Sequence, residues 1–80
     1  MQVLLFGRLA DLAGWRAREF EPAPATLSAL RARIAEIDEA LAEALTGPGV
    51  QVALDKTLVR GDAALSGVRE LAFLPPMSGG

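Results

Sequence analysis

Residues 26–45 read TLSALRARIAEIDEALAEAL, and their large apolar side chains recur at steps of three and four. Leucine or isoleucine occupies positions 27, 30, 34, 37, 41 and 45. This spacing is that of an α-helix with one apolar stripe. Thr26 suits the N-cap, and Gly47-Pro48-Gly49 ends the pattern. The sequence therefore predicts one main amphipathic helix, and it leaves open whether Asp38 divides that helix in two.

Two short strands are predicted before the helix. Residues 1–8 are rich in aliphatic and β-forming side chains, and residues 15–21 alternate bulky with charged side chains. Pro22 and Pro24 close the second of these runs, because proline cannot continue a strand ladder. Residues 9–14, which lie between the two runs, read as a helical turn.

Three further strands are predicted after the helix. Residues 50–54 and 58–59 flank the polar segment Asp55-Lys56-Thr57, which suits a hairpin turn. Residues 69–74 form a last strand, which ends at two consecutive prolines. The predicted element order is β-β-α-β-β-β.

A helix with a single apolar stripe buries that stripe only by lying across one face of the sheet. The fold class expected is α+β, a roll of β-grasp type whose mixed sheet pairs the first and last strands. Residues 1–74 form this domain, and residues 75–80 form an extended, flexible C-terminal tail.

The two-residue period of a strand assigns side chains to the two faces of the sheet. It directs Val3, Leu5, Leu71 and Phe73 toward the helix, and it directs Leu4, Phe6, Leu58, Ala72 and Leu74 away from it. An apolar face without a helix predicts a docking surface. A covering loop, or a strand phase shifted by one residue, is the alternative.

The composition excludes several classes of function. The 80 residues include no Cys and no His, so the usual thiolate nucleophile, imidazole base and zinc ligands are missing. Ser78 has no histidine to activate it, and we expect the domain not to be an enzyme on its own. The net charge is −2 and the arginines are scattered, which argues against nucleic acid as a partner. We also expect no metal, no membrane association, and a cytoplasmic location.

The C-terminal residues Pro75-Pro76-Met77-Ser78-Gly79-Gly80 carry the predicted chemistry. The prolines fix φ, so the tail leaves the domain in a stiff direction, and the glycines have no Cβ and can enter a narrow channel. The terminal carboxylate is ionised at neutral pH. A partner enzyme that binds ATP can convert this carboxylate to an acyl-adenylate, and a sulfur nucleophile can then displace AMP to leave a thiocarboxylate.

This C-terminus resembles that of a known family, the small sulfur-carrying subunits of molybdopterin synthase, which are ubiquitin-like sulfur carriers. Their ends read Phe or Leu, Pro-Pro, any residue, Ser or Thr, then Gly-Gly. The resemblance extends over the chain, and the matching segments are Val3-Leu4-Leu5-Phe6, Asp11-Leu12-Ala13-Gly14, Thr26-Leu27, Leu30-Arg31, Val52-Ala53-Leu54-Asp55, Gly61-Asp62 and Leu71-Ala72-Phe73. Asp55 and Ala63-Ala64 depart from the common pattern, in turns only.

The resemblance implies a heterotetramer with the large synthase subunit, into whose active site the tail inserts. Gly80, preceded by Gly79, would carry sulfur to cyclic pyranopterin monophosphate, giving the dithiolene of molybdopterin. No cofactor is expected on the chain, because ATP is used by an adenylating enzyme of ubiquitin-activating type and a sulfurtransferase supplies the sulfur. The partner-binding residues expected are Phe6, Leu58, Leu74, Pro75, Pro76, Met77 and Ser78.

Three alternatives remain open. Sister carriers that serve thiamine synthesis, tRNA thiolation or cysteine synthesis share the fold and the Gly-Gly end. A ubiquitin-like protein modifier uses the same adenylate with an amine acceptor, and a plain interaction domain has an inert tail. Among single residues, Trp15 is expected to be half-buried packing, and Arg8, Arg60 and Arg69 are expected to be solvated charges.

Overall fold

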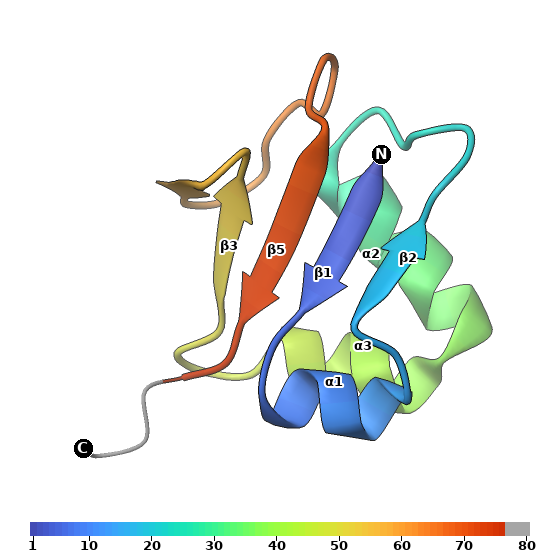
Figure 1. The fold of residues 1–80 in the computed structure, drawn as a ribbon, viewed down its shortest axis with the longest axis vertical. Coiled ribbons are helices and arrows are strands. Elements are labelled where there is room, and N and C mark those ends of the chain that lie inside the picture. Colours follow the sequence, from blue (N-terminus) through green and yellow to red (C-terminus); the bar gives the residue numbers. More distant parts are fainter. Residues whose placement is uncertain (77–80) are drawn as a thin grey trace.

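Five strands and three helices make up the fold of the computed structural model, which describes residues 1–76 (Figure 1). In chain order these elements are β1 (Gln2–Leu5), α1 (Arg8–Ala13), β2 (Ala17–Glu19), α2 (Leu27–Ile37), α3 (Glu39–Leu45), β3 (Gln51–Leu54), β4 (Thr57–Val59) and β5 (Glu70–Leu74). The predicted Met77, Ser78, Gly79 and Gly80 lie outside the described residues. The α+β class and the β-grasp arrangement are confirmed.

The sheet has the strand order β2-β1-β5-β3-β4. β1 and β5 lie at its centre and run parallel, whereas the other three neighbouring pairs are antiparallel. The central pairing brings Val3 beside Leu71 and Leu5 beside Phe73. The N-terminal and C-terminal strands therefore hold the sheet together at its middle.

One face of the sheet packs against α2, which lies behind the sheet in Figure 1. All four of the central-strand side chains predicted to face the helix are at most 2% exposed. Leu27, Leu30 and Ile34 of α2 meet them, and Leu41 and Leu45 of α3 complete the core. The predicted strand phase is therefore right.

The predicted helix is divided at Asp38. The backbone of Asp38 is extended, with φ −159° and ψ 93°, and the residue ends α2 and begins α3. Its N–H donates to the Ile34 oxygen at 2.8 Å, and its Oδ1 accepts from the Leu41 N–H at 3.0 Å. One residue thus caps two helices, and α3 can turn its leucines into the core.

The hairpin between β3 and β4 is tighter than expected. Thr57 belongs to β4, and the turn consists of Asp55 and Lys56 alone, with φ of 47° and 71°. Two positive φ values are those of a turn whose twist matches that of the flanking strands. The Asp55 Oδ1 also accepts from the N–H groups of Arg69 and Glu70, which ties this turn to the start of β5.

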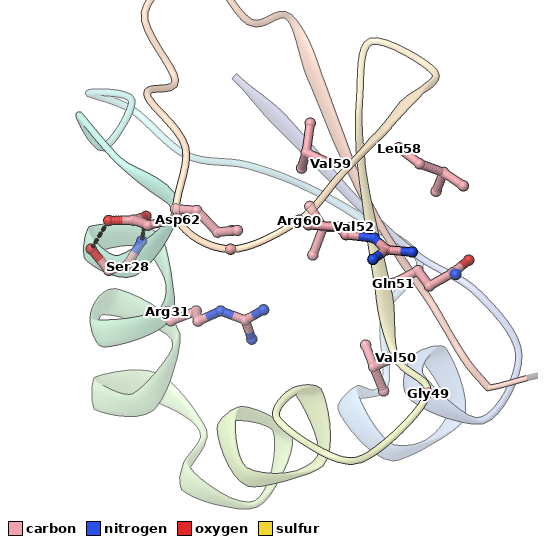
Figure 2. Close-up of a pocket in the computed structure, with 12 residues that line it drawn as sticks. Ser28, Arg31, Gly49, Val50, Gln51, Val52, Leu58, Val59, Arg60 and Asp62 are labelled. Carbon is pink, nitrogen blue, oxygen red and sulfur yellow. Dashed lines mark hydrogen bonds between the residues drawn. The ribbon is translucent and has the colours of Figure 1, made fainter.

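The chain between β4 and β5 is anchored on the start of α2. The Leu27 N–H donates to the Ala63 oxygen at 2.9 Å. The Asp62 carboxylate accepts from the Ser28 N–H and the Ser28 hydroxyl, both at 2.9 Å (Figure 2). These bonds from Ser28 hold the pKa of the Asp62 carboxyl group below its ordinary value of 3.8. Asp62 therefore fastens a long loop without burying a charge.

We expect the substitution Asp62→Asn to lower stability in a pH-dependent way. A carboxyl group whose pKa is lower in the folded chain stabilises the fold above its unfolded pKa, and this contribution is lost as pH falls toward the folded pKa. The Tm deficit of Asp62→Asn should thus be full at neutral pH and should shrink below pH 3.8. Thermal unfolding across this range measures the deficit.

The exposed Glu36 of α2 provides the control, because Glu36→Gln should leave Tm nearly unchanged at neutral pH. A deficit of Asp62→Asn that stays constant from neutral pH to pH 3 contradicts this role of the carboxylate.

Candidate functional site

The face of the sheet opposite α2 is apolar and is covered by no helix within residues 1–76 (Figure 1). Strand register places Leu58 beside Ala53, Ala53 beside Ala72, and Ala72 beside Leu4, in one row across four strands. We call the following residues the apolar sheet face: Leu4, Phe6, Ala53, Leu58, Ala72 and Leu74.

The apolar sheet face has a shallow middle and bulky sides. Ala53 and Ala72 are only 7% and 8% exposed, whereas Leu58 is 57% exposed and Phe6 is 46% exposed. Leu74 is half-buried at the end of β5. Burying large apolar side chains away from water lowers the free energy, so this shape suits a protein partner.

A hollow extends the apolar sheet face beside Phe6. It has a volume of about 430 Å³, and Leu4 and Phe6 belong to its lining. Asp11 of α1 and Arg16 line the hollow as well and add one charge of each sign. Sequence reasoning missed both charged residues, because only the return of α1 toward β2 brings them together.

A larger groove lies on the far side of Leu58, between α2 and the β3–β4 hairpin. Its volume is about 770 Å³, and Arg31 of α2 and Arg60, which follows β4, belong to its lining (Figure 2). Arg31 also donates to the Leu45 oxygen at 3.1 Å, and its guanidinium lies 5.4 Å from the centre of the Phe73 ring. Arg31 therefore closes the side of the core, while Arg60 is exposed.

The root of the tail adjoins the apolar sheet face. Pro75 is half-buried and Pro76 is exposed, directly after Leu74. The structure thus brings Phe6, Leu74, Pro75 and Pro76 to one end of the sheet, and it places Leu58 on the same face at the β4 edge. The roles predicted for these residues, and for residues 77–80, stay predictions.

The described residues hold no cluster of metal-ligating side chains. Within residues 1–76 no group of three Asp or Glu side chains gathers to hold a metal ion, and the sequence has no His or Cys. No buried polar or charged residue is found in this part of the chain either. None of the helices described by the structure is long and apolar enough to cross a membrane.

A family model described as the ThiS family matches residues 3–80. The chain belongs to the ThiS family. Two curated relatives, from Haemophilus influenzae and Escherichia coli, are 34% and 35% identical over 80 residues, which are all of this chain and 99% of each relative. Each of them is named molybdopterin synthase sulfur carrier subunit.

A solved structure shares the fold. The chain superposes on the crystal structure of SAMP1 from Haloferax volcanii with a TM-score of 0.81 and 26% identity, covering 99% of this chain and 97% of that one. The ubiquitin-like β-grasp fold is thereby confirmed. The resemblance to the sulfur-carrying subunits of molybdopterin synthase is confirmed by the family match and by the two relatives.

We expect the two faces of the sheet to respond differently to truncation. Leu71→Ala on the helix side leaves a cavity in the core and should lower the free energy of unfolding by about 2–5 kcal/mol. Leu58→Ala removes an exposed side chain and should change it by about 0.5 kcal/mol or less. Denaturant unfolding measures both values. A large loss for Leu58→Ala contradicts the reading of this residue as a contact surface.

Proposed function

We propose that this chain is a sulfur carrier in molybdenum cofactor biosynthesis, acting as the small subunit of a molybdopterin synthase. The observation that supports this most strongly is the full-length similarity to two relatives that bear this name. The apolar sheet face beside the root of the tail supports it too, because a carrier must dock with its partners while it presents its end.

The group that carries sulfur in this proposal is the carboxyl group of Gly80. The similarity to the family runs through residue 80, where Gly79 and Gly80 close the sequence. A carboxylate oxygen attacks the α-phosphorus of ATP bound by an activating enzyme, and pyrophosphate leaves. A persulfide then attacks the carbonyl carbon and displaces AMP, and a thiol cleaves the resulting S–S bond to free the thiocarboxylate.

In this proposal the domain presents the tail to its partner enzymes and does not itself catalyse a step. With no His or Cys in the sequence, it lacks the usual groups for activating a nucleophile or holding zinc. We propose that Phe6, Leu58 and Leu74 contact the large synthase subunit and the activating enzyme. Pro75 to Ser78 would line the entry of the tail into the partner, with Gly79 and Gly80 innermost, and the cytoplasm would be the site of the reaction.

Intact mass tests the proposed chemistry. After incubation with the activating enzyme, ATP and a sulfurtransferase with its sulfur substrate, we expect a mass gain equal to the exchange of one oxygen for sulfur. A chain that ends at Gly79 serves as the control, because shortening the tail should lower charging at least 100-fold through misplacement of the carboxylate. An unchanged mass of the full chain with a competent enzyme contradicts every version of the carrier.

A sulfur-delivery assay distinguishes a role in molybdopterin synthesis from the other proposed functions. The charged carrier, mixed with the large subunit and the pterin precursor, should lose sulfur at the rate at which dithiolene forms. Conjugates to lysine that survive thiol reagents would instead identify a protein modifier.

The apolar sheet face is tested by paired substitutions of exposed leucines. Leu58→Ser should weaken binding to the large subunit at least 10-fold, because a side chain that dominates an interface contributes about 2 kcal/mol or more. Leu12 of α1 is the matched control, since it is 50% exposed and lies outside this face, so Leu12→Ser should change affinity less than twofold. Isothermal titration measures both, and equal effects would remove the apolar sheet face from the interface.

A further inference from the structure

The topology brings two glycines to either side of the point where the tail begins. β1 runs parallel to β5, so the chain that follows β1 lies beside the end of β5. β3 runs antiparallel to β5, so the chain that precedes β3 lies on the other side. Gly7 follows β1 and Gly49 precedes β3. We call this pair the glycine bracket, and Figure 1 shows both segments at the lower end of the sheet.

The two prolines of the tail pack against these glycines. A Cβ atom on Gly7 would lie 3.1 Å from Pro75 Cγ, and one on Gly49 would lie 2.7 Å from Pro76 Cβ and 3.5 Å from Pro76 Cα. Carbon atoms in contact prefer about 3.5–4.0 Å. Any other residue at position 49 therefore pushes Pro76 away, and its backbone with it.

The conformations of the glycines are consistent with this role. Gly7 has φ +56° and Gly49 has φ +83°, which are backbone conformations that side chains rarely allow. Pro75 and Pro76 have φ fixed by their rings. The two prolines therefore lie against the backbones of Gly7 and Gly49 and have little freedom to change direction.

We propose that Gly7 and Gly49 are positioning residues that set the direction in which the chain leaves the domain at Pro76. The inference rests on the proposed function, in which an activating enzyme holds the apolar sheet face and must find the carboxyl group of Gly80 at a fixed place beside ATP. Gly80 is the fourth residue after Pro76, within a reach of at most about 14 Å. The direction of the chain at Pro76 therefore decides how the tail enters the docked enzyme, and displacement of a reacting atom by about 1 Å can cost 100-fold in rate.

The substitution Gly49→Ala tests this role against a matched control. Gly14 has the same φ of +83°, but a Cβ there would meet nothing within 4 Å. Gly14→Ala therefore carries the cost of a positive φ without touching the tail. Gly49→Ala adds the collision with Pro76.

The readout is adenylate formation by the activating enzyme, with kcat and KM measured separately. We expect Gly49→Ala to lower kcat at least 10-fold while KM stays within twofold, because the apolar sheet face is intact. Gly14→Ala should leave both within twofold of the wild-type values. Equal kcat values for Gly49→Ala and the wild type overturn the inference, and so does an equal loss in both variants.

A second measurement needs neither the enzyme nor a substitution. In NMR spectra of the isolated full chain, nuclear Overhauser contacts should join the Pro76 ring to the Hα protons of Gly49, and their absence overturns the inference. This result is independent of the proposed function. A wild-type chain that is never adenylated refutes the carrier role. A wild type and a Gly49→Ala variant that are adenylated equally well refute only the role of the glycine bracket.

Discussion

The parallel pairing of β1 with β5 is the interaction on which the rest of the structure depends. It places Val3, Leu5, Leu71 and Phe73 side by side at the middle of the sheet, none of them more than 2% exposed. Parallel strands cannot be joined by a tight turn, so the chain between them must cross from one end of the sheet to the other. α2 lies within that crossover and packs its stripe onto the surface that the pair creates.

The core is built on one face of this sheet, and the other apolar face has no helix over it within residues 1–76 (Figure 1). In a chain of 80 residues a single core gives modest stability, so each apolar side chain that stays in water forgoes stability that its burial would add. Leu58 and Phe6 are nevertheless about half exposed. Arg31 shows how the boundary is made, since its guanidinium covers the Phe73 ring and bonds to the Leu45 oxygen at the edge of the core. One apolar face of the sheet is thus buried in the core, and the other stays at the surface.

Local periodicity predicted most of this architecture. The three- and four-residue spacing identified the helical region, and the two-residue alternation assigned the faces of β1 and β5 correctly. Trp15 is half-buried, as expected, and packs at the border of the core. The sequence does not show whether Asp38 divides the helix, because aspartate is equally acceptable on the solvent-exposed side of a continuous helix. The helix is divided there because the Asp38 side chain caps the Leu41 N–H and because α3 must turn to bury two leucines.

Other features had no local signal. Asp55 and Lys56 adopt positive φ without being glycine, and the polar character of Thr57 suggested a longer turn than the two residues observed. The glycine bracket joins residues far apart in the chain, and only the strand order brings them to the prolines. Arg16 and Asp11 line the same hollow for the same reason. Spacing along the sequence cannot reveal a neighbourhood that the sheet topology creates.

The position of β5 has a consequence for synthesis. This strand is both the middle of the sheet and the segment that leads into the tail, so a nascent chain that lacks it has nothing to join the β1–β2 pair to the β3–β4 pair. The hydrophobic core can then close only after β5 has left the ribosome, because Leu71 and Phe73 of this strand lie at its centre. A chain that stops short of β5 therefore leaves the apolar side chains of β1 and β3 in water.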